Sequence, residues 1–153
     1  MAKNNTHESG ETTSEEATRK SLEDKYVEFQ VLEQQVKQLQ TNVQTMDSQI
    51  MEIKSMQLSV AELNTVPENS KALFPIANGM FVRGTVADPR KILVNVGGNV
   101  VIDKTVNETI ELLETQLTDM TKVRQQLLSD LEKTSSKMQN LETELQKIMS
   151  ASG

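Results

Sequence analysis

The side chains that carry most enzyme chemistry are scarce in this sequence. It contains no cysteine, which excludes disulfides, thiolate metal sites and cysteine nucleophiles. The single histidine, His7, lies in a polar stretch with no apolar segment to enclose it. Neighbouring carboxylates such as Glu23 and Asp24 stand near an expected helix start, where they suit the helix dipole. The Gly-Gly-Asn run at residues 97–99 precedes an expected strand, which favours a hairpin turn over a phosphate loop. We therefore expect no enzyme, no metal and no cofactor.

Composition and charge narrow the class of protein further. Only 36% of the 153 residues are apolar, against about 45–50% in ordinary domains, so a thick core is not available. The net charge of −6 disfavours binding to nucleic-acid phosphates. The sequence has no run of about 18 apolar residues to span a bilayer, and it does not open like a signal peptide. We expect a cytoplasmic protein with no nucleic-acid and no membrane partner.

The positions of proline and glycine divide the chain. All three prolines and four of the six glycines fall between residues 67 and 98, which leaves a long uninterrupted arm on either side. Residues 1–20 are acidic and lack large apolar residues after Met1, so we expect a disordered tail. Capping-box patterns begin at Thr13 and at Ser21, and either could start the first helix. The expected segments are the tail, a helix over 21–65, strands over 66–104 and a helix over 105–150.

Both arms repeat apolar residues with a period of seven, which is typical of a coiled-coil seam. Lys25 and Gln57 interrupt the first seam, and Arg124 and Thr134 interrupt the second. The uninterrupted seam positions are Phe29, Leu32, Val36, Leu39, Val43, Met46, Ile50 and Ile53 in the first arm, and Val106, Ile110, Leu113, Leu117, Met120, Leu127, Leu131, Met138, Leu141, Leu145 and Ile148 in the second.

The two arms have similar lengths, so they can fold back on each other as an antiparallel pair. Val60 would then lie near Val106, and Lys25 near Leu141. A coiled coil between separate chains is the alternative, and the seam pattern alone does not decide between them. A Thr-x-x-Glu capping box at Thr105 predicts the start of the second helix.

The central segment predicts two β-hairpins. Residues 72–77 and 80–86 flank an Asn-Gly pair, and residues 91–96 and 100–103 flank the Gly-Gly-Asn run. An Asp-Pro-Arg turn at residues 88–90 separates the hairpins. Two hairpins of this length cannot close a core, and their edges remain open. We therefore expect an assembly module that pairs with other chains.

Apolar residues outside the seam mark further surfaces. Tyr26, Val27 and Val31 lie beside Leu22, and Met149 lies near the end of the second arm. Exposed apolar surface there predicts contacts with apolar groups of other molecules. Equally, these residues could pack together over a frayed helix end or contact a neighbouring arm. Other off-seam residues are expected to pack on the strands (Met51, Met56, Leu58, Leu63 and Leu112) or have no assigned role (Val123 and Leu128).

Two central stretches resemble the α-class subunit of prefoldin. They are Ala-Leu-Phe-Pro-Ile-Ala-Asn-Gly-Met-Phe-Val at residues 72–82 and Lys-Ile-Leu-Val-Asn-Val-Gly-Gly-Asn-Val-Val-Ile-Asp-Lys-Thr at residues 91–105. The resemblance covers roughly residues 20–150. It implies an α+β fold, in which a long antiparallel two-helix coiled coil carries two central β-hairpins that join an intersubunit β-barrel.

The same resemblance implies a function and partners. It implies an ATP-independent holdase in which two α-class and four β-class subunits bind unfolded polypeptides and deliver them to a group II chaperonin. The residues expected to touch clients are Leu22, Tyr26, Val27, Val31, Leu145, Ile148 and Met149. Those expected to mediate assembly are Leu73, Phe74, Ile76, Phe81, Val82, Ile92, Val94, Val96, Val101 and Ile102. The alternative is a non-catalytic structural or tethering coiled coil that assembles through its hairpins.

Overall fold

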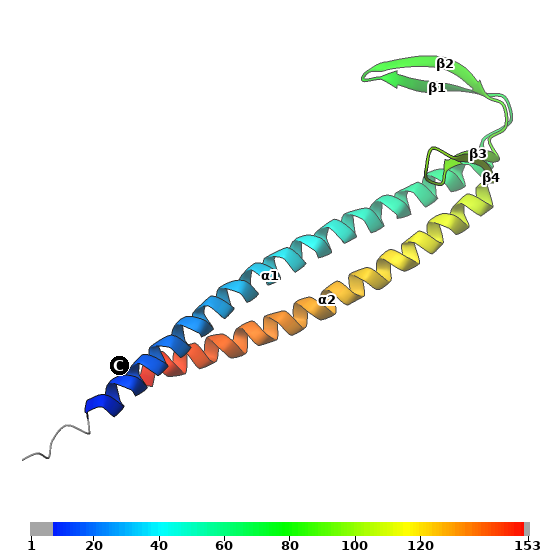
Figure 1. Cartoon of the computed structure of the whole chain (residues 1–153). Coiled ribbons are helices and arrows are strands. Elements are labelled where there is room, and N and C mark those ends of the chain that lie inside the picture. The colour runs from blue at the N-terminus through cyan, green and yellow to red at the C-terminus, as the bar shows by residue number, and fades with distance from the viewer. Residues whose placement is uncertain (1–7, 152–153) are drawn as a thin grey trace, which may run out of the picture. The chain divides into compact units, whose positions relative to one another are not determined.

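The computed structural model describes residues 8–151 as two long helices joined by two β-hairpins (Figure 1). The elements are α1 (Glu8–Glu62), a short 3-10 turn (Leu63–Thr65), β1 (Ser70–Ala77), β2 (Met80–Val86), β3 (Lys91–Asn95), β4 (Val101–Thr105) and α2 (Val106–Ala151). The predicted α+β architecture is confirmed. The chain divides into a terminal unit, Met1–Thr45 with Gln125–Gly153, and a central unit, Met46–Arg124.

Helix α1 begins earlier than the sequence predicts. The expected disordered tail ran to residue 20, but residues 8–20 are helical, and residues 1–7 lie outside the described residues. Both expected starting points, Thr13 and Ser21, lie inside the helix. Apart from Gly10 this stretch contains no helix breaker, and adding a residue to an existing helix costs far less than nucleating one. The helix therefore extends through a segment whose residues 10–20 are all exposed.

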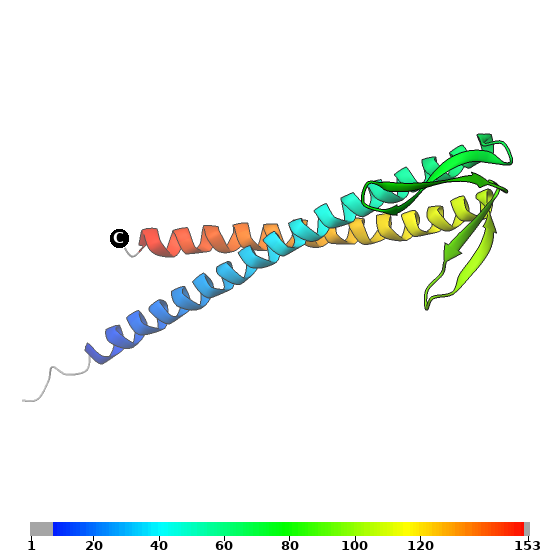
Figure 2. The ribbon, with the colours of Figure 1, turned by 90° about the horizontal axis from the view of Figure 1, so that it is seen from above.

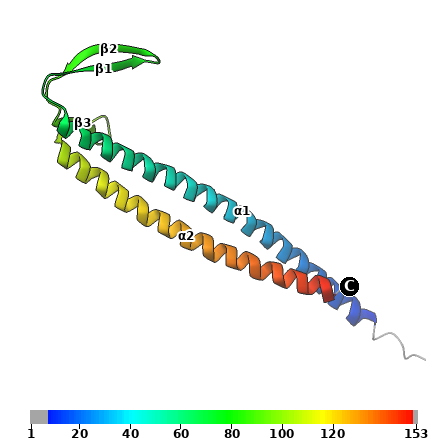
Figure 3. The same cartoon turned by 180° about the vertical axis from the view of Figure 1, so that it is seen from behind.

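In the terminal unit, α1 and α2 lie side by side and antiparallel (Figure 3). The buried residues of this unit are Val36, Leu141 and Leu145, all of which belong to the predicted seam. The seam position Lys25 pairs with Glu144 across the helices, with Nζ 2.9 Å from Oε2. Glu144 lies about one turn beyond Leu141, the expected neighbour of Lys25, so the two helices are shifted by about one turn.

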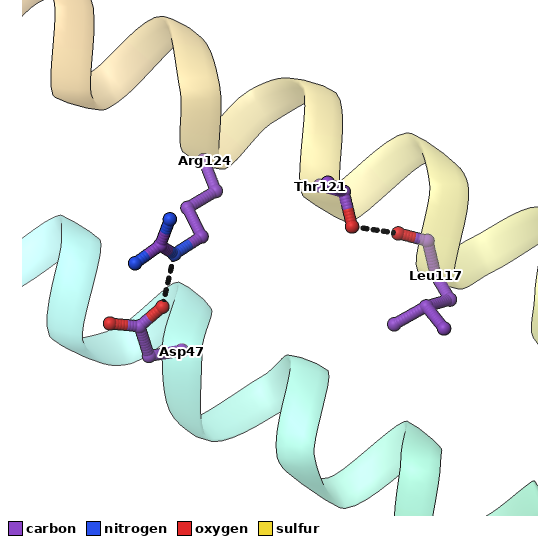
Figure 4. A network of polar contacts seen from close by, with 4 residues as sticks. All are labelled: Asp47, Leu117, Thr121 and Arg124. Carbon is purple, nitrogen blue, oxygen red and sulfur yellow. Dashed lines mark hydrogen bonds and ion pairs between the residues drawn. The ribbon is translucent and has the colours of Figure 1, made fainter.

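In the central unit the seam is again apolar with polar interruptions. Ile50, Ile53, Val106 and Leu113 are buried, as the heptad pattern predicts. Each polar residue of the seam in this unit has a partner on the opposite helix. The amide of Gln57 donates to Glu114 at 2.7 Å, and Arg124 pairs with Asp47 (Figure 4). The polar interruptions therefore pair across the helices.

Strands β1 and β2 form an antiparallel hairpin around Asn78-Gly79, as predicted. The φ of Gly79 is 76°, a left-handed conformation that favours glycine. The register pairs Phe74 with Val82 and then shifts between Pro75 and Ala77. Pro75 lacks a backbone N–H, so the irregularity falls next to the residue that cannot donate to the ladder.

Strands β3 and β4 form a second, separate antiparallel hairpin (Figure 2). The residues of its loop, Gly97, Gly98 and Asn99, all have positive φ, at 110°, 57° and 60°. The N–H of Val96 donates to the carbonyl of Val100 at 3.0 Å and closes the loop. The Gly-Gly-Asn run is therefore a turn, as expected, and β4 leads directly into α2.

The residues between the hairpins join the strands to both helices. Pro89 is fully buried, and the N–H of Arg90 donates to Asp88 Oδ1 at 3.1 Å. The Arg90 guanidinium donates to the carbonyls of Val66 at 3.1 Å and Asn64 at 3.4 Å, just beyond the end of α1. The Arg90 carbonyl accepts the N–H of Val106, the first residue of α2. One residue thus links the end of α1 to the start of α2.

The start of α2 is capped as the sequence predicts. The Thr105 hydroxyl accepts the N–H of Glu108 at 3.1 Å, and Glu108 Oε2 accepts the N–H of Thr105 at 3.3 Å. Two N–H groups at the helix start are therefore satisfied reciprocally. The hydroxyl of Thr109 donates to the Thr105 carbonyl, which allows this polar residue to be buried.

Candidate functional site

The terminal unit contains an apolar groove between α1 and α2, which we call the terminal groove. Its volume is about 640 Å³. It is lined by Leu22, Glu23, Tyr26, Val27 and Phe29 of α1 and by Glu142, Leu145, Gln146 and Met149 of α2. Because both helices contribute, the groove exists only where their antiparallel pairing brings the two sets of side chains together.

The groove combines a buried residue with exposed apolar residues. Leu145 is buried in the seam, whereas Val27 and Met149 keep 58% and 65% of their surface exposed. Exposed apolar side chains that border a hollow are typical of a site that binds other apolar groups. Methionine also adapts its shape to irregular partners, because its side chain is unbranched and flexible.

Five of the seven residues expected at the client-binding end line this groove, namely Leu22, Tyr26, Val27, Leu145 and Met149. Val31 instead lines a neighbouring hollow on α1, together with Val27. Ile148 is half-buried and does not line the groove. The structure therefore brings most of the expected set together and separates two members from it.

Four lining residues were absent from the expected set. Phe29 had been assigned to the seam, and Glu23, Glu142 and Gln146 resemble ordinary solvated positions. The signal that could have found the glutamates is their place in the heptad. Glu23 directly follows Leu22, and Glu142 directly follows Leu141, so both glutamates are next to seam residues.

An ion pair crosses the helices of the terminal unit. Lys25 donates a hydrogen bond to Glu144, and this bond together with the lysine charge lowers the pKa of the Glu144 carboxyl below its ordinary value. Since both side chains are partly exposed, the pair is screened by solvent. The pair therefore contributes little to the stability of the folded chain.

The two hairpins present a second set of exposed apolar residues. Leu73, for example, keeps 63% of its surface exposed. Eight of the ten residues expected to mediate assembly are exposed, namely Leu73, Phe74, Ile76, Phe81, Val82, Val96, Val101 and Ile102. The other two, Ile92 and Val94, are half-buried. Met80, Leu93 and Val100 are also exposed and were not in the expected set.

Both faces of the first hairpin are apolar. Phe74 and Val82 are paired on one face, while Leu73 and Phe81 lie on the other. The ring of Phe74 lies over Gly84, where an added Cβ would come within 2.7 Å of it. A two-stranded sheet with apolar groups on both faces needs other elements to cover them, and here these groups remain exposed.

Comparison with known proteins identifies the family. The family model described as "Prefoldin subunit" matches residues 32–151, which include α1 from Leu32 onward, both hairpins and α2. The chain belongs to the prefoldin family. Prefoldins are non-catalytic chaperones whose subunits assemble into oligomers, so this chain is a chaperone-type protein and not an enzyme.

The similar curated proteins are named prefoldin subunit alpha. The one from Methanosarcina mazei is 31% identical over 93 residues, which cover 59% of this chain and 66% of that protein. The one from Methanococcus vannielii is 29% identical over 89 residues, which cover 58% and 61%. The chain thus spans about two thirds of the length of these relatives.

A solved structure supports the same fold. The cryo-EM structure of filamentous PFD from Methanocaldococcus jannaschii superposes with a TM-score of 0.68 at 20% identity, covering 75% of this chain and 95% of that chain. In addition, neither of the two long helices within residues 8–151 has an apolar stretch of the length that a membrane span requires.

Proposed function

We propose that this prefoldin chain is an α-class subunit of an ATP-independent holdase. In this proposal it assembles through its hairpins with a second α-class and four β-class subunits in the cytoplasm. The complex binds unfolded polypeptides in its terminal grooves and delivers them to a group II chaperonin. The observation that carries the proposal is the terminal groove, whose apolar walls stay exposed at residues such as Val27 and Met149.

The groove offers the kind of contact that a holdase requires. An unfolded chain offers apolar side chains in no fixed order, so its holder needs contacts without strict direction. Burial of apolar surface supplies about 25 cal/mol per Å² without directional demands. Several grooves that act together raise the avidity while each contact remains easy to release. Release is needed for delivery to a second chaperone.

The test is the aggregation of a chemically denatured client, followed by light scattering. The chain is first assembled with a β-class partner, and no nucleotide is added. We expect the wild-type complex to suppress aggregation at a near-equimolar ratio to the client. Val27→Ser with Met149→Ser should raise the concentration of complex needed for the same suppression by about tenfold, because two apolar contacts are lost in each α-class groove. Both substituted residues line the groove, whereas Ile148 does not.

A matched control substitutes the same residue types elsewhere. Met51 and Val123 in the central unit are 72% and 48% exposed, so Met51→Ser with Val123→Ser should leave holding unchanged. Size-exclusion chromatography verifies that both double variants assemble. If a well-formed wild-type complex failed to suppress aggregation, the holdase proposal would be wrong and a structural or tethering role would be favoured.

A further inference from the structure

The charged residues that line the terminal groove are all of one sign. They are Glu23 from α1 and Glu142 from α2, and no lysine, arginine or histidine lines the groove. Both glutamates are exposed, and neither forms an ion pair within residues 8–151. Two free carboxylates thus border an apolar floor from opposite helices.

The sequence around the groove also carries an excess of negative charge. Between residues 10 and 31, six acidic side chains outnumber three basic ones. One of the three, Lys25, is already bound to Glu144 at 2.9 Å. On α2, Lys147 follows Gln146 but does not line the groove, and its charge acts on Glu144. The net field at the groove is therefore negative, which raises the local concentration of positive groups.

We propose that the terminal groove selects polypeptide segments in which lysine or arginine flanks apolar residues. This inference rests on the proposed function, since it names the class of client segment that the same groove prefers. The apolar floor holds the apolar side chains, and Glu23 and Glu142 pair with the flanking cations. Segments flanked by aspartate or glutamate are disfavoured, because like charges meet at both walls.

The size of the preference follows from the exposure of the carboxylates. An exposed ion pair contributes little by itself, so two of them give a preference of about fivefold for lysine-flanked over serine-flanked segments. The preference falls as salt is added, because exposed charges are screened over about 10 Å at 0.1 M ionic strength. Binding of an uncharged segment does not weaken in this way.

Three synthetic peptides test the inference against the assembled complex. They share one core of leucine, valine and phenylalanine and differ only in their flanks, which are lysine, serine or glutamate. Fluorescence anisotropy with an uncharged dye gives the three affinities. We expect the lysine-flanked peptide to bind most tightly and the glutamate-flanked peptide most weakly, with the difference reduced at high salt.

Paired variants locate the effect in the groove. Glu23→Gln with Glu142→Gln should bring the lysine-flanked and serine-flanked affinities to within about twofold of each other. The control Glu52→Gln with Glu132→Gln removes the same charge from exposed glutamates that do not line the groove, and it should keep the preference.

The possible outcomes separate the two proposals. Equal binding of the lysine-flanked and glutamate-flanked peptides, with normal holding of denatured client, would overturn charge selection alone. Loss of the preference in the Glu52/Glu132 control would overturn it too, because the overall charge and not the groove would then be responsible. Failure of all three peptides to bind, together with no suppression of aggregation, would count against the proposed function itself.

Discussion

The terminal groove and the hairpins both expose large apolar side chains, but their backbones differ. In the groove the backbone belongs to α1 and α2, whose N–H and C=O groups are bonded within each helix. In the hairpins each strand pairs on one edge only, because the sheets have two strands each. The hairpins therefore present unpaired backbone groups as well as apolar side chains.

This difference indicates what kind of partner each region can bind. An open strand edge requires a second strand at a fixed distance and register, so its partner must have a defined structure. A groove between helices contacts only the side chains of its partner, so the partner needs no defined backbone structure. In our proposals, the same residue types thus serve assembly in a fixed register in one region and contact without a fixed register in the other.

The largest expected effect comes from a charge in the hairpins. Val94 is half-buried and pairs with Ile102 across the second hairpin. We expect Val94→Asp to weaken assembly by about 3–5 kcal/mol, because the carboxylate would be buried without a partner. Native mass spectrometry or light scattering coupled to size exclusion should then show subunits in place of the oligomer.

A matched variant makes this test specific. Gln40 is exposed on α1, so Gln40→Asp adds the same charge without burying it and should leave the oligomer intact. A Val94→Asp protein that still assembled would contradict the prediction, because assembly would then not depend on an apolar side chain at this position.

A smaller effect is expected where the hairpins join the helices. The Arg90 guanidinium satisfies two carbonyls beyond the end of α1, whose last turn contains no basic residue. We expect Arg90→Ala to lower the free energy of unfolding by about 1.5 kcal/mol, measured by urea denaturation. Arg90→Lys should recover only part, because it keeps the charge but loses the planar pair of donors.

The control for this variant is Lys54→Ala, which removes an exposed positive charge from α1 that forms no ion pair within residues 8–151. If Arg90→Ala were as stable as Lys54→Ala, the two hydrogen bonds would have no role in joining the hairpins to the helices. Client holding per assembled complex should stay unchanged in both variants, because the groove does not depend on this junction.

The features that could be predicted from the sequence are those encoded by local patterns. The heptad spacing identified every buried apolar residue of α1 and α2, from Val36 to Leu145. The Thr105–Glu108 capping box and the Asn-Gly and Gly-Gly-Asn turns also follow from short motifs. Such motifs are predictive because their hydrogen bonds join residues close together in the chain.

The features that could not be predicted depend on distant partners or on cooperativity. Arg90 donates hydrogen bonds to carbonyls 24 and 26 residues away, and no short sequence motif predicts a contact between residues so far apart. The packing of Met51, Met56 and Leu58 on the strands was predicted wrongly, since all three remain exposed. An off-seam apolar residue looks the same in sequence whether it is buried by its own chain or left for another. The helix start at Glu8 was also missed, because residues 8–20 lack the apolar pattern on which the prediction relied.

The smallest expected effect concerns the ion pair beside the groove. Lys25 lowers the pKa of Glu144, so the pair stabilises the folded chain above the ordinary pKa of a carboxyl group. This contribution is lost as the pH falls through the lowered pKa of the folded state. We expect Lys25→Met to raise the Glu144 pKa toward its ordinary value, which an NMR titration of the side-chain carboxyl would measure.

The control for this titration is Lys37→Met, which removes the lysine of a different pair, 3.7 Å from Glu33 on the same helix. It should leave the Glu144 pKa lowered, whereas an unchanged pKa in Lys25→Met would mean that the lysine is not the cause. Client holding at neutral pH should change by less than about twofold in Lys25→Met, since an exposed pair contributes little to stability. A client segment can shift along the groove without breaking backbone hydrogen bonds of the chain, because those bonds lie within each helix. The hairpins have no such freedom, because a strand edge that shifts loses its backbone hydrogen bonds together.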